Sequence, residues 1–204
     1  MFSDDKWNYR GLTIRAEHDR DAECPLDEDN ESVRFVTFER NSTLSGYHDF
    51  SKPTEAPAWA EENGFAVYPL YKYEHGRVAY STGGFSCPWD SGQAGFVLVR
   101  RADYGDDEAR MAEIAKGMCG TVMDWCNGDC FGYTVEDDDG EELDSGWGFV
   151  GSDHDESGLR EQAESAAAYA ADKIAAEDAA RLDENAIEDA ERLEDSRPDM
   201  YVGP

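Results

Sequence analysis

Two runs of acidic residues limit most strongly what this chain can fold into. Residues 17–31 carry eight acidic residues and one basic residue, Arg20, and residues 136–156 carry ten acidic residues and no Lys or Arg. Carboxylates at this density repel one another unless they are solvated, bound to a metal or met by a cationic partner. Both runs therefore belong at the surface, and the core has to come from the segments between and after them.

The acid excess extends over the whole chain of 204 residues, in which 47 Asp and Glu stand against 18 Lys and Arg, a formal charge of −29. Binding to nucleic acid or to an anionic membrane surface needs clustered cations, so we expect no direct contact with either. No apolar run is long enough to span a bilayer, and residues 1–10 lack the layout of a signal peptide. These features predict a cytoplasmic protein.

Hydrophobic periodicity predicts strands and one amphipathic helix in the first 157 residues. The expected strands are residues 9–17, 33–40, 65–73, 77–81, 94–101, 131–135 and 143–150, with a short helix at 58–63. A longer helix begins at Asp106 or Asp107 and ends near Cys126, because its apolar residues recur at helical spacing. Pro69 indicates an edge or a bulge in its strand. Without regular βαβ alternation, this order favours an α+β fold with a mainly antiparallel sheet and one packed amphipathic helix.

The last segment, residues 158–204, is rich in Ala and Glu and predicts a long acidic helix as far as Arg197. The expected domains are therefore an α+β domain at 1–157 and a helical tail at 158–204. The apolar stripe of this helix is thin, because Ala buries little area. Either the helix lies against the domain and frays near its end, or it projects into solvent or pairs with a second copy as a homodimer.

The residues that bind metals and cofactors form no recognisable motif. Cys24, Cys87, Cys119, Cys126 and Cys130 lack the paired spacing of zinc knuckles and indicate free thiols in a reducing compartment. The stretch DDDGEELD at residues 137–144 lacks the twelve-residue calcium loop, and its Asp-Asp-Gly is typical of a hairpin turn. No metal and no cofactor is therefore predicted.

The enzymatic alternative needs a nucleophile and a base in one cleft. Cys87 with His75, or Ser91 with His75 and Asp90, would supply them in a small hydrolase-like enzyme. These residues stand in no known nucleophile-elbow pattern, and the chain has no P-loop or dinucleotide fingerprint. The sequence therefore favours a protein that is not an enzyme and has no catalytic residues.

Four sequence blocks stand out: residues 68–75 (YPLYKYEH), 85–96 (FSCPWDSGQAGF), 128–133 (GDCFGY) and 140–149 (GEELDSGWGF). Together they resemble a family of small acidic proteins encoded by phages, prophages and plasmids, and the resemblance covers roughly residues 9–155. It implies a mobile-element context and a cytoplasmic protein of the host cell, without a mechanism. Gly146 departs from the family, which usually has Cys at that position.

Carboxylates on a rigid surface can imitate DNA, because helix neighbours at i,i+3 and i,i+4 lie about 5–6 Å apart, similar to successive phosphates. The predicted function is a non-enzymatic inhibitor of the DNA-mimic type that blocks a basic nucleic-acid-binding protein of the host, such as a CRISPR or restriction complex. A solvated acidic surface adapted to high salt, with no mimicry, is the alternative. The expected partner-binding residues are Asp27, Glu28, Asp29, Trp89, Asp90, Asp137, Asp138, Asp139, Glu141, Glu142, Asp144, Glu188 and Asp189.

Overall fold

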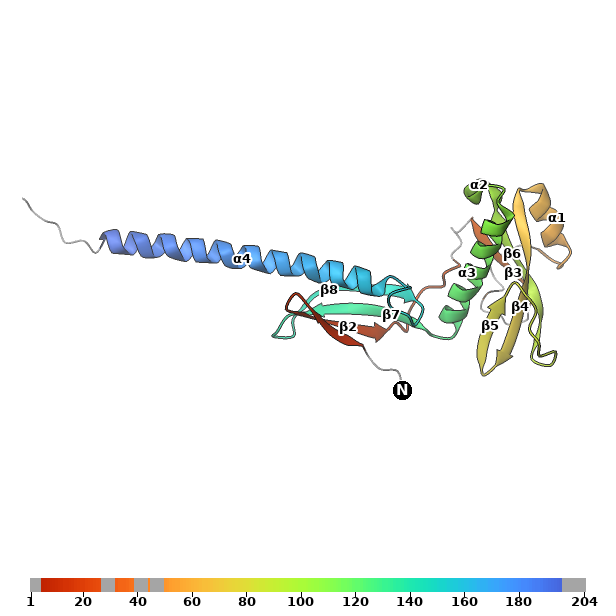
Figure 1. The fold of residues 1–204 in the computed structure, drawn as a ribbon, viewed down its shortest axis with the longest axis horizontal. Helices are drawn as coiled ribbons and strands as arrows, with labels where there is room; N and C mark the ends of the chain where they lie inside the picture. The colour runs from red at the N-terminus through yellow and green to blue at the C-terminus, as the bar shows by residue number, and fades with distance from the viewer. Residues whose placement is uncertain (1–4, 27–31, 39–43, 45–49, 196–204) are drawn as a thin grey trace, which may run out of the picture. The chain divides into compact units, whose positions relative to one another are not determined.

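The computed structural model describes residues 5–26, 32–38, 44 and 50–195. It has the predicted α+β fold, with the strands arranged in two antiparallel sheets of order β1-β2-β7-β8 and β3-β6-β4-β5 (Figure 1). The elements are β1 (Lys6–Tyr9), β2 (Leu12–His18), β3 (Val33–Thr37), α1 (Glu55–Glu62), β4 (Phe65–His75), β5 (Arg77–Ser81), β6 (Ser91–Arg100), α2 (Arg101–Tyr104), α3 (Glu108–Cys126), β7 (Cys130–Glu136), β8 (Glu142–Val150) and α4 (Leu159–Asp195).

The chain divides into two compact units. The smaller unit comprises Met1–Glu17, Tyr133–Gly146 and Arg160–Pro204, and the larger unit comprises His18–Gly132 and Trp147–Leu159. This division cuts the chain at other places than the boundary predicted at residue 157. The C-terminal helix is grouped with strand residues from both ends of the α+β segment. The helix and these strand residues therefore form one folded unit, which is distinct from the larger unit.

The sheet β3-β6-β4-β5 forms the centre of the larger unit, with α3 on one face and α1 on the other (Figure 1). Val97 and Val99 of β6 belong to the core cluster that contains Met111 of α3. Leu98, which lies between them, packs with Ala60 of α1. Successive side chains of a strand point to opposite faces. Both faces of β6 are therefore buried, which explains its continuous hydrophobic run.

The boundaries of α3 follow from local signals, as predicted. Asp107 is the N-cap, and its side chain accepts hydrogen bonds from the backbone N–H groups of Ala109 and Arg110, at 3.1 Å each. After Cys126, the side chain of Asn127 donates to the carbonyl of Val78 at 2.7 Å and accepts from its N–H at 3.0 Å. The amide thus pairs with the edge strand β5 as a neighbouring strand would, and it fixes the end of α3 to the sheet.

The strand that contains Pro69 has the predicted bulge, close to the proline. The register between β4 and β6 shifts between Leu70 and Tyr71, and β5 pairs with β4 only from Tyr71 onward. Gly95 of β6 pairs with Leu70, and a Cβ on it would lie 1.8 Å from the carbonyl oxygen of Val36 in β3. Only glycine permits this close approach of two backbones.

The smaller unit begins with a hairpin that the sequence analysis missed. The strand predicted at residues 9–17 is wrong at its start, because Tyr9 ends β1 and Leu12 begins β2. Arg10 and Gly11 have φ of 51° and 88° and form the turn between them. A two-residue hairpin turn of this type needs positive φ at both positions, which Arg seldom adopts, so the turn carries no usual sequence signal.

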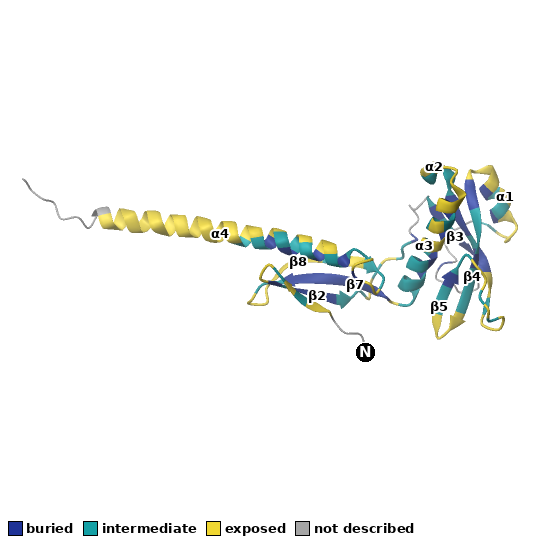
Figure 2. Cartoon of the chain, in the orientation of Figure 1, coloured by how far each residue is buried: buried dark blue, intermediate teal, exposed yellow. Residues whose placement is uncertain are grey.

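The helix α4 changes character along its length. In its first part the side chains of Ala163, Ala167 and Ala170 are buried, whereas residues 175–193 are all exposed (Figure 2). Arg10 fixes the point of change, because its guanidinium donates to the carbonyl of Ala168 at 3.4 Å and to Asp172 Oδ1 at 2.7 Å. The helix thus combines the two predicted arrangements: it packs at its start and extends beyond the sheet afterwards.

Replacement of Gly146 tests the packing of the smaller unit. A Cβ on Gly146 would lie 2.6 Å from the ring of Tyr133, which is buried. We expect Gly146→Ala to lower the free energy of unfolding by about 1–3 kcal/mol, because the ring must move. Urea denaturation followed by circular dichroism measures the loss. Gly117→Ala in α3, where no atom lies within 4 Å of the added Cβ, should instead raise stability by about 0.5–1 kcal/mol. Equal effects of the two substitutions would contradict this account.

Candidate functional site

A group of exposed carboxylates lies on the turn between β7 and β8. The turn is closed by hydrogen bonds from Asp137 N–H to the Glu141 carbonyl at 3.1 Å and from Gly140 N–H to the Asp137 carbonyl at 3.2 Å. Asp137 Oδ1 also accepts from the N–H groups of Asp139 and Glu141, at 2.9 Å each. Asp137 therefore shapes the turn. The carboxylates left exposed are those of Asp138, Asp139, Glu141 and Glu142.

The negative charge of these four carboxylates is not balanced by ion pairs with described residues. Within the described part of the chain, no cation forms an ion pair with any of them. Glu136 is paired with Arg15 at 2.9 Å, and Asp144 is half-buried and accepts from the hydroxyl of Tyr133 at 3.4 Å. Asp144 was predicted to bind a partner, but its hydrogen bond with Tyr133 also links β8 to β7. The turn is thus a fixed frame that carries four solvated negative charges.

The exposed half of α4 carries the second group of carboxylates. Glu188 and Asp189, both predicted to bind a partner, lie on it and are exposed. Asp189 is paired with Arg192 at 2.9 Å, an exposed pair of the kind that contributes little to stability. The acidic residues of this half are Asp172, Glu177, Asp178, Asp183, Glu184, Glu188, Asp189 and Glu191, against the basic residues Lys173, Arg181 and Arg192.

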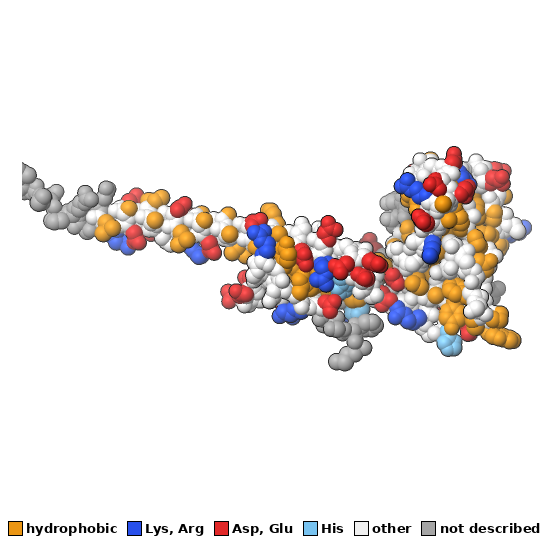
Figure 3. Space-filling model, in the orientation of Figure 1, with side chains coloured by type: hydrophobic (Ala, Val, Ile, Leu, Met, Phe, Trp, Pro, Cys, Tyr) orange, Lys and Arg blue, Asp and Glu red, His pale blue; other side chains and the backbone are white. Residues whose placement is uncertain are grey.

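The two groups lie at the same end of the smaller unit. The β7–β8 turn and the point where α4 leaves the sheet are both at this end (Figure 1), and red carboxylates mark both segments (Figure 3). The smaller unit has 23 acidic and 8 basic residues among 76, whereas the larger has 24 and 10 among 128. Net acidic charge per residue is therefore higher in the smaller unit than in the larger unit. We call residues 137–142 together with the α4 segment 172–193 the acidic end.

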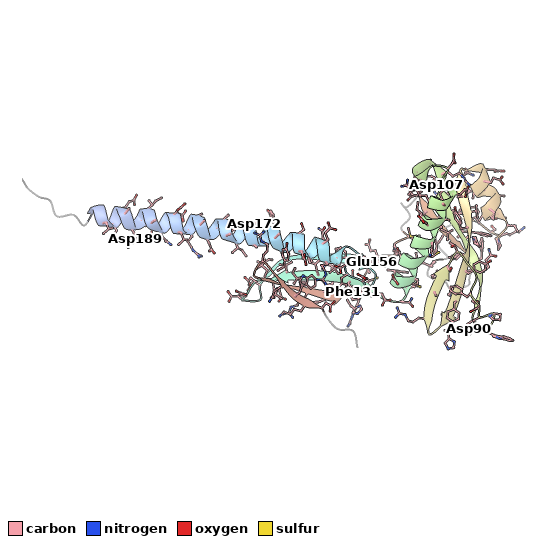
Figure 4. All side chains as sticks on the ribbon, in the orientation of Figure 1. Asp90, Asp107, Phe131, Glu156, Asp172 and Asp189 are labelled. Atoms are coloured by element: carbon pink, nitrogen blue, oxygen red, sulfur yellow. The ribbon has the colours of Figure 1, made fainter. Side chains whose placement is uncertain are left out.

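Trp89 and Asp90 belong to the larger unit, on the turn that precedes β6 (Figure 4, where Asp90 is labelled). The side chain of Trp89 is 92% exposed. It borders a shallow depression of about 350 Å³ that Lys72 and Glu74 also line. A large exposed aromatic side chain beside charged groups is typical of a protein contact point. Trp89 thus fits the predicted role, but in a different unit from the acidic end.

The residues of the enzymatic alternative meet at the same turn, but not in the predicted pairing. Asp90 accepts a hydrogen bond from Cys87 Sγ at 3.4 Å and lies 3.5 Å from Nδ1 of His75. The hydroxyl of Ser91 donates to the carbonyl of Cys87. In the predicted enzymatic pairing, the imidazole of His75 would contact the thiol or the hydroxyl. Here a carboxylate stands next to the thiol and the hydroxyl bonds to backbone, so the contacts shape the turn.

The first acidic run is described only in part. Asp27, Glu28 and Asp29 lie outside the described residues. Asp19 has a structural role, because its carboxylate accepts from the N–H groups of Asp21 and Gly148, at 3.1 Å each. An open depression of about 770 Å³ lies here, lined by residues 18–23, Trp147 and Gly148. This depression was not predicted, because a local sequence pattern does not show that residue 147 lies next to residue 21.

Buried carboxylates join α3 to β5 in the larger unit. Arg77 forms an ion pair with the buried Asp129, whose N–H donates to the carbonyl of Asp124 at 2.9 Å. Burial raises the pKa of Asp124, the charge of Asp129 raises it further, and Arg77 acts in the opposite direction. This group holds the C-terminal end of α3 against β5, and Asp129 within it is buried, so we regard it as structural.

Comparison with protein-family models, curated proteins and solved structures finds no match for this chain. The resemblance to small phage- and plasmid-encoded proteins therefore stays a prediction. In the part of the chain that the structure describes, no helix combines the length and the apolar character needed to cross a membrane. Among the same residues, no three His, Cys, Asp or Glu side chains gather closely enough to hold a metal ion.

The thiols should differ sharply in reactivity. Burial raises the pKa of Cys119 to about 12 and those of Cys126 and Cys130 to about 11, so at pH 8 about one thiol in a thousand or fewer is ionised. We expect iodoacetamide to modify half-buried Cys87 in the folded chain, and these three only after unfolding in urea. Mass spectrometry of peptides measures each site, with Cys87→Ser as the control. Modification of Cys119 in the folded chain at the rate of Cys87 would contradict the fold.

Asp124→Asn should raise stability at neutral pH. Because the folded-state pKa of Asp124 is raised, its ionisation destabilises the fold. This penalty is absent below the unfolded pKa of about 3.9, grows as pH rises from the unfolded to the folded pKa, and is complete above the folded pKa. We expect a gain of about 0.5 kcal/mol at pH 7 that vanishes near pH 3, measured by urea unfolding. Asp106→Asn, at a 92% exposed side chain, controls for the lost charge. Equal gains from both substitutions would refute the assignment.

Proposed function

We propose that the protein is a non-enzymatic inhibitor that places its acidic end against a basic nucleic-acid-binding surface of another protein. One observation carries the proposal: the exposed carboxylates of the β7–β8 turn stand on a backbone whose N–H groups donate to the side chain of Asp137, and they lie at the same end of their unit as an exposed acidic helix. Charges that are already in place lose little conformational freedom on binding. A fixed acidic surface therefore binds a basic groove better than a mobile acidic loop does.

The spacing of charge along α4 supports imitation of one nucleic-acid strand. Residues 172–191 contain eight acidic residues over about 30 Å of helix, or one per about 4 Å. Phosphates follow one another at about 3.4 Å along each DNA strand, and at about 1.7 Å of axis when both strands are counted. Lys173 and Arg181 reduce the net density further. The helix thus offers the charge of a single strand, and the carboxylates of the β7–β8 turn add to it.

The host context comes from the resemblance to proteins of phages and plasmids. Such elements meet restriction and CRISPR systems, whose DNA channels are basic. An acidic protein in the host cytoplasm that occupies such a channel excludes DNA by competition and needs no catalytic residue. The proposed target is therefore a DNA-binding defence protein, recognised by its positive charge.

Displacement of DNA tests this function. A fluorescently labelled duplex is bound to each of a CRISPR effector, a restriction endonuclease and a histone-like protein, and the full chain is added while anisotropy is followed. We expect release from at least one defence protein, and a concentration for half-release that rises about tenfold between about 50 and 200 mM salt, because screening weakens contacts between exposed charges. Absence of release from every defence protein at low salt would refute the proposal for these targets.

Matched charge variants show whether the acidic end is responsible. The test variant carries Asp138→Asn, Asp139→Asn, Glu141→Gln and Glu142→Gln. The control variant loses the same charge at exposed sites of the larger unit, through Glu61→Gln, Glu62→Gln, Asp106→Asn and Glu113→Gln. We expect the test variant to need about tenfold more protein for half-release, and the control to change little. An equal loss in both would mean that total charge acts alone, as in a surface adapted to high salt.

A further inference from the structure

The open depression beside Trp147 belongs entirely to the larger unit. Its lining consists of residues 18–23, Trp147 and Gly148, and its volume is about 770 Å³. Trp147 is 50% exposed. Concave surfaces of this size with an aromatic side chain and a few polar groups are the usual places where proteins bind a ligand or a partner's side chain.

Hydrogen bonds fix the backbone of both segments that line the depression. The carboxylate of Asp19 accepts from Gly148 N–H at 3.1 Å. Gly148 has φ of 90°, a conformation that favours glycine, so this bond also holds the backbone that follows Trp147. In the other segment, Nε1 of Trp125 donates to the carbonyl of Ala22 at 2.9 Å. The lining is therefore in place before a partner arrives, which lowers the entropic cost of binding.

The charge of this lining is negative, and two of its carboxylates are available. Three carboxylates, those of Asp19, Asp21 and Glu23, stand against the single guanidinium of Arg20. Asp19 is occupied by backbone N–H groups. Asp21 and Glu23 are exposed, and within the described ranges neither side chain forms an ion pair or accepts a hydrogen bond. A cation that enters the depression therefore meets carboxylates that it does not have to take from another partner.

The depression beside Trp89 differs in this respect. There Glu74 is paired with Lys72 at 2.8 Å, and Asp90 lies 3.5 Å from Nδ1 of His75. Both carboxylates that line it already have partners, although its tryptophan is the more exposed of the two. Trp89 thus offers a matched control within the same unit: an exposed indole without available carboxylates.

An indole beside available carboxylates selects a planar cation. The guanidinium of arginine stacks on an aromatic face and donates to carboxylates in a fixed fork, whereas an anion such as phosphate is repelled by this lining. Sites for small molecules enclose most of the ligand's surface, and this depression is open. A side chain that projects from another protein fits such a site, because the rest of that protein covers it from outside.

We infer that the depression binds an arginine side chain of a partner protein, with the guanidinium stacked on Trp147 and paired with Asp21 and Glu23. The inference deepens the proposed function and rests on it, because the target of that function is a basic surface. It adds a contact in the larger unit that recognises one kind of side chain. The acidic end, by contrast, attracts positive charge without regard to its shape.

Two short peptides test the contact. The probe is a blocked Gly-Gly-Arg-Gly-Gly peptide, and its counterpart carries citrulline, which has nearly the same shape without the charge. Each is titrated into the ¹⁵N-labelled full chain at low salt. We expect the arginine peptide to shift the signals of the Trp147 indole N–H and the Gly148 amide in a saturable way, with a dissociation constant of about 1 mM. The citrulline peptide should bind at least about fivefold more weakly.

Matched variants locate the site. Trp147→Ala, followed at the Gly148 amide, should weaken binding of the arginine peptide at least about fivefold, and Trp89→Ala should leave it unchanged within about twofold. Asp21→Asn with Glu23→Gln should also cost at least about fivefold, whereas the same loss of charge through Glu61→Gln with Glu62→Gln should not. The carboxylate variants change exposed side chains alone, so the test stays decisive if Trp147→Ala disturbs β8.

The outcomes separate this inference from the proposed function. No saturable shift with the arginine peptide, equal binding of the two peptides, or equal effects of Asp21/Glu23 and Glu61/Glu62 replacement overturns the arginine contact, and DNA release is then judged by its own assay. Self-association in sedimentation that Trp147→Ala abolishes would assign the depression to an arginine of a second copy and overturn the inference. Binding of the arginine peptide without release of DNA from any defence protein would overturn the proposed function and leave the arginine contact in place.

Discussion

Repulsion between carboxylates is the constraint on which the rest of the structure depends. The fold meets it by giving some acidic residues a backbone partner and leaving the others in water. Asp107 caps α3, Asp19 accepts from two backbone N–H groups, and Asp153 accepts from those of Asp155 and Glu156, at 3.0 and 3.1 Å. Such hydrogen bonds stabilise the ionised form and fix turns at the same time. Some carboxylates thus fix the backbone through hydrogen bonds, whereas others remain exposed to solvent.

The elements that the sequence predicted are those with local signals. The helix from Asp107 to Cys126 has an N-cap and a helical apolar period, and β5 lies between turn residues, so both were placed closely. The hairpin at Arg10 was missed, because an Arg with positive φ carries no usual turn signal. The division into two sheets was missed as well, since it depends on pairings between segments that are more than a hundred residues apart.

The candidate site was predictable to a similar extent. Exposure of the acids at residues 137–142 follows from a run that cannot be buried. The different role of Asp137, which holds the turn, depends on hydrogen bonds that composition does not reveal. The place where α4 stops packing was not predictable, because its apolar positions are mostly Ala and carry a weak hydrophobic signal along the whole segment. Among the described residues of α4, Ala170 is the last that is buried.

The blocks that resemble phage and plasmid proteins inform on the fold more than on the mechanism. Gly95 is required where two strands approach closely, Asp90 organises the turn before β6, and Gly146 makes room for the ring of Tyr133. Each has a structural reason to be where it is. Function therefore has to be sought in the residues that the fold does not use, and on the smaller unit these are the solvated carboxylates. The carboxylates attract any cationic surface and set the rate and salt dependence of association.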